Sequence, residues 1–369
     1  MSAAQVEIVL IASVTAAACA LVGAFLVLRR AAMLSDAVSH AILPGIVVGF
    51  FLTESLASPL LLVAAAASGV LAVALIEALG NTRLVKGDAA IGLVFPALFS
   101  IGVILIARYA SGVHLDTDAV LLGDLAFAWI ERVEAGGRDL GPQALWVVAA
   151  LLGLDLLFVV LFYKELKLAT FDAALAAALG FAPRALHYAL MGLVSVTAVG
   201  AFDVVGSILV VALMVAPPAA AYLLTDRLPR LRVLAVGLGV LAAVTGYALA
   251  RVLDASIAGA MATMAGVLFA LVFLLAPERG VLAQARRRSA QRREFARRML
   301  LVHLLHHEHT PEAERECRVP HLQEHLRWEP GFAETAVRYA ERTGTVRRAG
   351  DRLSLTPAGR TAAQEAMVE

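Results

Sequence analysis

The chain has 369 residues, of which 60% are hydrophobic and 17% are charged, and its mean hydropathy is +0.80. Soluble domains are usually about 45–50% apolar and about 25% charged, so this composition excludes an ordinary soluble protein and indicates an integral membrane protein. The net charge is only +1, but apolar runs fill most of the chain and its last part is strongly charged. We therefore predict a transmembrane domain over residues 1–283 and a soluble domain over residues 284–369.

Nine apolar runs are candidates for membrane spans, since a helix needs about 20 residues to cross the hydrocarbon core. Two of the runs are short, so we expect an all-α polytopic membrane domain with about eight or nine transmembrane helices. The first run is about twice as long as a signal-peptide core and no basic residue precedes it, which predicts a retained span. In chain order the runs cover approximately residues 6–28, 36–53, 57–79, 89–108, 144–163, 187–201, 204–224, 232–251 and 255–276.

The placement of Lys and Arg predicts how the spans are oriented. If the N-terminus is outside, ten basic loop residues lie in the cytoplasm and four lie outside, which agrees with the positive-inside rule. The domain of residues 284–369 is then cytoplasmic as well. The ten are Arg29, Arg30, Arg83, Lys86, Lys164, Lys167, Arg184, Arg227, Arg230 and Arg232, and the four are Arg108, Arg132, Arg138 and Arg251.

Two ionisable residues, Asp36 and His40, begin the second run. Residues four apart share one helix face, so both side chains can reach one ion. A carboxylate with an imidazole suits Mn²⁺ or Zn²⁺, and the lack of a thiolate argues against Cu(I). Pro44-Gly45 interrupts the same run, as in the broken helices beside transporter binding sites. A plainer alternative is that Asp36 caps the helix and His40 bonds to a neighbour.

The stretch MLSDAVSHAILPGI at residues 33–46 resembles the signature of the manganese/zinc/iron permease family called ABC-3. VVGSILVVALMVAP at 204–217 and AYLLTDR at 221–227 resemble the family too, and together the similarity covers roughly residues 5–280. In that family the aspartate and the histidine line the translocation path and contact the metal, and Asp36 and His40 match them. Asp203 and Asp155 are further candidates, either as ligands or as partners of a serine, a tyrosine or the backbone.

The resemblance implies a multi-pass permease subunit of an ATP-binding-cassette importer in the bacterial inner membrane. Its cargo would be Mn²⁺ or Zn²⁺, with Fe²⁺ as a third candidate, delivered by an extracytoplasmic metal-binding lipoprotein, and no cofactor would be tightly bound. A second permease copy or a paralogue would complete the pore. In the outer segment, His114, Asp116 and Asp118 either guide cations or form an ordinary polar loop.

ATP hydrolysis is expected on a separate ATPase subunit, so the chain itself is predicted not to be an enzyme. The sequence has no Gly-x-x-x-x-Gly-Lys-Ser/Thr motif and no Gly-Lys dipeptide. Asp172 is a good N-cap and Gly180 a good C′ residue, which predicts a short helix over residues 173–179. In the family a short helix here seats in a groove of the ATPase, a role that the resemblance carries to Glu165, Phe171, Asp172 and Gly180. An ordinary amphipathic connection is the alternative.

The charged C-terminal segment resembles a small α+β winged helix-turn-helix domain. We expect it to regulate or brace the transporter and do not expect it to bind DNA. The predicted elements are helices at 293–307, 319–328 and 331–343, a β-hairpin at 345–356 and a closing helix at 357–367.

This segment is rich in histidine. His303 and His307 share a helix face, as do His321 and His325, and Cys317 lies between the two pairs. Imidazoles with a thiolate could form a zinc or manganese sensor. Exposed histidines without a ligand are the plainer interpretation.

Two other functions remain open from the sequence. A membrane-anchored metal-responsive regulator would use the spans as a sensor, although nine spans with a broken helix exceed what an anchor needs. A secondary metal transporter would draw on an ion gradient, and it would not need the insert at residues 164–180.

Overall fold

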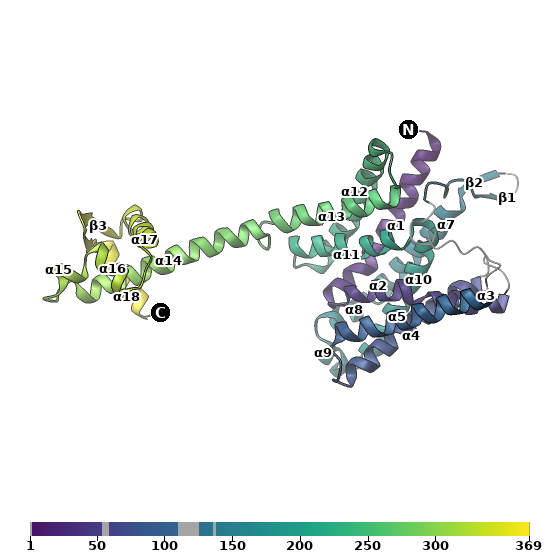
Figure 1. Cartoon of the computed structure of the whole chain (residues 1–369), viewed down its shortest axis with the longest axis horizontal. Coiled ribbons are helices and arrows are strands. Elements are labelled where there is room, and N and C mark those ends of the chain that lie inside the picture. Colours follow the sequence, from purple (N-terminus) through teal and green to yellow (C-terminus); the bar gives the residue numbers. More distant parts are fainter. Residues whose placement is uncertain (1, 54–58, 110–124, 136–137, 369) are drawn as a thin grey trace. The chain divides into compact units, whose positions relative to one another are not determined.

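The structure is a computed structural model that describes residues 2–53, 59–109, 125–135 and 138–368 (Figure 1). The chain divides into two compact units, Met1–Arg279 and Gly280–Glu369. The first is the membrane unit and the second is called the tail below. His114, Asp116 and Asp118 lie outside the described residues.

Within the described ranges, nine helical segments of the membrane unit are long and apolar enough to span a membrane, which confirms the predicted polytopic fold. α2 and α3 together form the second span, and the other eight spans are single helices. The elements are α1 Ala3–Leu28, α2 Ala32–Ala41, α3 Leu43–Thr53, α4 Pro59–Asn81, α5 Gly87–Tyr109, α7 Gln143–Leu161, α10 Pro183–Val205, α11 Ser207–Leu224, α12 Leu228–Leu253 and α13 Ile257–Leu275.

The sixth span differs most from its prediction. The apolar run suggested residues 187–201, whereas α10 extends from Pro183 to Val205 and ends at Gly206, whose φ is 80°. The hydropathy pattern marks only the part of a helix that lies in hydrocarbon. The first turn of α10, which carries Arg184, therefore fell outside the predicted run.

Small residues let the central helices approach closely. α1 packs against α11 and α12, and a Cβ atom on Gly23 would lie 2.0 Å from the carbonyl oxygen of Met214. A Cβ atom on Gly246 of α12 would likewise lie 2.3 Å from the Cα atom of Met261 in α13. Close backbone approach through glycine and alanine is how helices associate in lipid, where no hydrophobic force drives them together.

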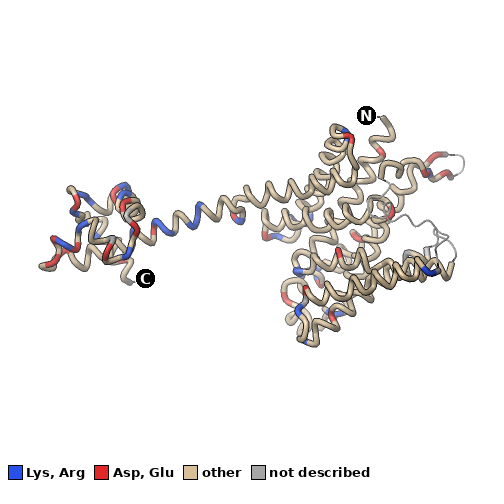
Figure 2. The backbone as a smooth tube through the Cα atoms, viewed as in Figure 1, with Lys and Arg blue, Asp and Glu red and all other residues tan. Residues whose placement is uncertain are grey.

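Apolar side chains cover the outside of the membrane unit, and most of its charged residues lie at helix ends and in connections (Figure 2). α1 and α10 are the most buried spans, and α5, α7 and α13 are the least buried. The order of burial places α1 and α10 at the centre and leaves the other three helices facing lipid or a partner.

Three connecting features position the polar ends of the spans. α8 Tyr163–Phe171 and α9 Ala173–Ala178 join α7 to α10. An antiparallel hairpin of β1 Arg132–Ala135 and β2 Arg138–Pro142, which the sequence analysis did not predict, precedes α7. Arg132 ties this hairpin to α1 through Glu7, at 3.1 Å.

The tail follows the predicted order of helices, hairpin and closing helix. Its first helix begins at Val281, well before the predicted residue 293, because the basic start of this helix lacks the apolar periodicity on which the prediction relied. A buried core of leucine, valine and alanine side chains holds the elements together. They are α14 Val281–His307, α15 Ala313–Glu316, α16 Val319–His325, α17 Pro330–Arg342, β3 Val346–Ala349, β4 Arg352–Leu355 and α18 Pro357–Val368.

Candidate metal site and its surroundings

Asp36 and His40 lie together on one face of α2. The Nε2 atom of His40 is 3.6 Å from Oδ1 of Asp36, and the side chains are 29% and 50% exposed, respectively. The N-cap of α2 is Ala31, five residues before Asp36, and the first turn of the helix contains no acidic residue. Asp36 therefore does not cap the helix, and its carboxylate is accessible beside an imidazole.

The second span breaks directly after this pair. Ile42 is a turn residue between α2 and α3, and Pro44 follows it. Proline has no N–H group, so it cannot donate to the carbonyl of His40, four residues earlier. The hydroxyl of Ser68 in α4 donates to the carbonyl of Ala41 at 2.7 Å. The break thus leaves a backbone oxygen near the imidazole without its usual helical donor.

Close packing fixes the position of the break. A Cβ atom on Gly45 would lie 2.3 Å from the carbonyl oxygen of Ala64 in α4, and one on Gly102 of α5 would lie 3.0 Å from the nitrogen of Pro44. The ring of His40 lies against Phe95 and Phe99 of α5, with centroid distances of 5.7 and 6.0 Å. Neighbouring helices on both sides therefore hold the segment that carries the pair.

The other two aspartates have different surroundings. Asp155 of α7 is fully buried and accepts a hydrogen bond from the hydroxyl of Thr197 in α10, at 2.8 Å. Asp203 lies near the end of α10 and is exposed. Over the described part of the chain, the structure does not gather either aspartate with Asp36 and His40 into a group of three possible ligands.

The predicted short helix is present as α9, with the predicted caps. The carboxylate of Asp172 accepts from the backbone N–H of Leu175 at 2.9 Å, and Gly180 has a φ of 86°. Pro183 is the first residue of α10, where its missing N–H and fixed φ suit the start of a helix. Phe171, which ends α8, is 60% exposed although it is a large aromatic residue.

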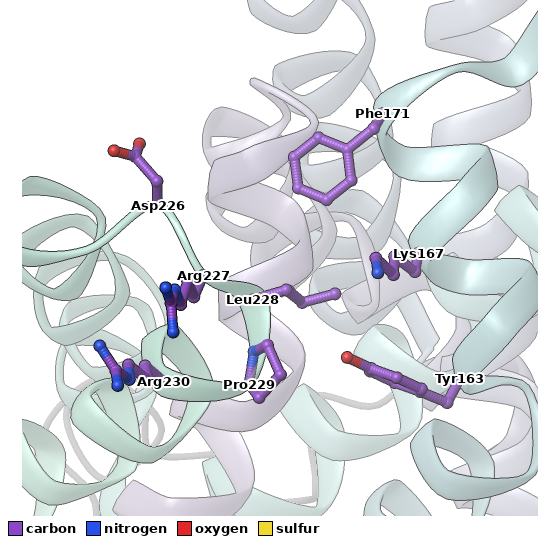
Figure 3. Close-up of a pocket in the computed structure, with 8 residues that line it drawn as sticks. All are labelled: Tyr163, Lys167, Phe171, Asp226, Arg227, Leu228, Pro229 and Arg230. Atoms are coloured by element: carbon purple, nitrogen blue, oxygen red, sulfur yellow. The ribbon is translucent and has the colours of Figure 1, made fainter.

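Phe171 lines a pocket of about 470 Å³ between α8 and the segment that leads from α11 into the first turn of α12 (Figure 3). Tyr163, Lys167 and Phe171 form one side. The other side is continuous in sequence and consists of Asp226, Arg227, Leu228, Pro229 and Arg230. Figure 3 shows Phe171 and Lys167 facing this connection across the gap. The pocket combines an aromatic wall with three basic residues.

A chain of polar contacts joins α8 to the spans. Nε of Arg29 donates to the hydroxyl of Thr170 at 3.1 Å, and Nη1 of Arg29 lies 3.3 Å from Nδ1 of His187. Nε2 of His187 is 2.6 Å from a carboxylate oxygen of Glu77, whose other oxygen accepts from the hydroxyl of Tyr188. Glu77 belongs to α4, which packs against α2 and α3. The network therefore connects the end of α8 to the helix that holds the broken span.

In the tail, the structure brings four of the predicted histidines close together. The possible ligand atoms of His303, His307 and His325 all lie within 4.8 Å of one another, as do those of Glu316, His321 and His325. Burial lowers the pKa of His303, which favours its neutral form. Cys317 lies instead in the apolar core, where burial raises the pKa of its thiol, and it belongs to neither group.

Comparisons with known proteins give one consistent result. The model of the family described as "ABC 3 transport family" matches residues 3–276. The zinc transport system membrane protein TroD of Treponema pallidum is 50% identical over 97% of both chains. The manganese transport system membrane protein MntD of Bacillus subtilis is 46% identical over 75% of this chain and 94% of its own. In a solved structure of PsaBC from Streptococcus pneumoniae in complex with Fab, a chain with 27% identity superposes with a TM-score of 0.63, covering 76% of this chain and 94% of that one.

Proposed function

Because this chain belongs to the ABC 3 transport family and is the membrane-spanning permease subunit of a metal-ion ABC importer, we propose that Asp36 and His40 contact the transported ion. The observation that supports this role is their placement at 3.6 Å on one helix face, directly before a break in the span. An ionisable pair in a span is costly unless it faces a cavity or a ligand. Two side chains and a nearby carbonyl oxygen would offset part of the ion's dehydration.

Manganese and zinc are the proposed cargoes. Carboxylate and imidazole ligands suit both ions. The relatives described above are named for one or the other, TroD for zinc and MntD for manganese. We propose that the ion arrives from an extracytoplasmic binding protein and passes between this chain and a second copy or a paralogue. Iron is the third proposed cargo.

The ATPase subunit would dock on the α8–α9 segment and the pocket beside it. Phe171 offers an exposed aromatic side chain, and the basic residues of the pocket offer partners for acidic groups. The contacts from Thr170 through Arg29 and His187 to Glu77 would transmit a displacement of α8 to α4. With the N-terminus outside, as the basic residues predict, this surface and the tail both lie in the cytoplasm.

Metal accumulation in cells that lack their own copy of the gene tests the proposal. Cells carrying the parent protein, D36N, H40Q or the control D254N would be grown with limiting Mn²⁺, Zn²⁺ or Fe²⁺, and their metal content measured by elemental mass spectrometry. D36N and H40Q should lower uptake by more than about 10-fold, since losing even an outer-shell partner of a metal site costs about 10–100-fold in affinity. Asp254 caps α12 in a left-handed conformation that asparagine also adopts, so D254N removes a carboxylate charge without affecting the path.

Uptake at the parental rate by D36N would show that the carboxylate is not a ligand on the path. The same cells without the ATPase subunit should accumulate no metal. If they do accumulate it, an ion gradient drives transport and the proposed ATPase docking is wrong.

A further inference from the structure

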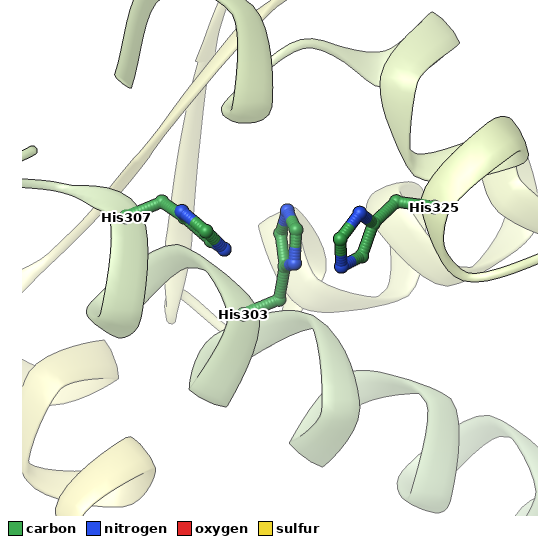
Figure 4. Close-up of side chains that lie close together, drawn as sticks. All are labelled: His303, His307 and His325. Carbon is green, nitrogen blue, oxygen red and sulfur yellow. The ribbon is translucent and has the colours of Figure 1, made fainter. Parts of the chain in front are cut away.

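The tail carries a group of side chains that the transport function does not use. Figure 4 shows His303 between His307 and His325, with His303 and His307 projecting from α14 and His325 from α16. The ring centroid of His303 is 4.7 Å from that of His307 and 5.2 Å from that of His325. His303 and His307 lie one helix turn apart, and α16 brings His325 to the same place from a second helix.

One hydrogen bond determines which nitrogen of His303 can bind a metal. Nε2 of His303 lies 3.1 Å from the backbone carbonyl oxygen of Glu316. A carbonyl oxygen can only accept, so Nε2 must carry the proton and Nδ1 must carry the lone pair. Metal-binding histidines typically donate their other N–H to a carbonyl or a carboxylate in this way. Since the ring of His303 is buried, its orientation is also fixed by packing.

Glu316 contributes the negative charge that the histidines lack. Its Oε2 atom is 2.6 Å from Nε2 of His321 and 3.9 Å from Nδ1 of His325. Oε2 of Glu316 and Nε2 of His321 are both buried, and their contact pairs a carboxylate with an imidazole that is charged only if it is protonated. A cation bound beside this carboxylate would supply the positive charge that a neutral imidazole lacks.

We propose that the tail binds one Zn²⁺-like ion, with His303, His307 and His325 as ligands and with Glu316 and His321 beside them. The two groups of three share His325, and a neutral imidazole has a single lone pair, so they cannot hold two ions at once. Nitrogen ligands with one carboxylate suit Zn²⁺, and the same donors bind Mn²⁺ less tightly. An ion at this place would clamp α16 onto α14. The proposal does not rest on the role of Asp36 and His40.

Zinc binding by the purified full-length protein in detergent tests the site. Titration with Zn²⁺ against a fluorescent chelator gives the number of tight sites, and Co²⁺ absorption reports nitrogen and oxygen ligation. The test variant is H307Q/H325Q, and its matched control is H306Q/H309Q, which removes two exposed histidines of the same segment. Any zinc bound by the membrane unit is common to all three proteins, so the difference between them reports on the tail.

We expect H307Q/H325Q to lose one tight Zn²⁺ per chain, with binding weakened by more than roughly 100-fold, and the control to keep it. E316Q preserves the size of the side chain and should weaken binding by roughly 10–100-fold, which covers the case in which the double variant fails to fold. Full stoichiometry and affinity in both H307Q/H325Q and E316Q would overturn the proposal. Equal loss in the control would overturn it too, because binding would then be adventitious contact with surface histidines.

Discussion

Replacing Phe171 with alanine should weaken the association of the permease with its ATPase subunit. Phe171 is 60% exposed, so its truncation removes little packing from the permease itself. Burying a whole phenylalanine side chain yields about 1.5–3 kcal/mol, and burying the exposed part would yield about 0.9–1.8 kcal/mol. Losing that free energy of binding would raise the dissociation constant about 5- to 20-fold.

The assay is the dissociation constant of the ATPase subunit for the purified permease in detergent, measured beside metal uptake in cells. Leu157→Ala is the matched control, because Leu157 is a large apolar residue of α7 that is 64% exposed and does not line the pocket. F171A should lower ATPase affinity and uptake while its expression stays at the parental level. If F171A and L157A bind the ATPase equally well, the exposed aromatic is not a docking residue and the α8–α9 segment is an ordinary connection.

Two further predictions concern stability. Gly23→Ala should lower the melting temperature of the membrane unit in detergent, because the new Cβ atom would clash with the backbone of Met214. Overpacking of this kind costs about 1–3 kcal/mol. An unchanged melting temperature would mean that α1 and α11 separate easily. Glu308→Gln should slightly increase hydrogen exchange in α18 at neutral pH, since both oxygens of Glu308 accept from Arg360 and exposed pairs of this kind stabilise only weakly. The hydrogen bonds from Arg360 hold the pKa of Glu308 below its usual value, so the pair stabilises the folded tail above the unfolded pKa, and the difference between parent and variant should vanish as the pH falls through the lowered pKa.

Features that depend on neighbours in sequence were predictable. The nine spans follow from apolar runs, and the caps of α9 follow from the preferences of Asp172 and Gly180. The Asp36–His40 pair follows from helical spacing alone, since four residues make one turn. In each case the physical cause lies within a few residues, so no knowledge of the tertiary fold is needed.

Features that depend on distant contacts were missed. Arg29, Glu77 and His187 meet although more than a hundred positions separate the last two, and no local pattern marks them as partners. Cys317 is near the histidines in sequence, which made it a candidate ligand, and its side chain lies in the core of the tail. Glu316, one position earlier, faces the histidines instead. Side-chain direction at the end of a four-residue helix is set by tertiary packing, which the sequence pattern does not report.

The site in the span and the site in the tail differ in a way that matches their proposed roles. Conduction requires that an ion be bound well enough to enter and weakly enough to leave. Asp36 and His40 supply only two side chains, both partly exposed, on a helix that is broken directly beyond them. The tail instead brings three imidazoles together, one of them buried and fixed by a carbonyl, and a buried carboxylate oxygen lies 3.9 Å from His325. More ligands in a more rigid setting hold an ion longer, so the span is suited to passage and the tail to retention.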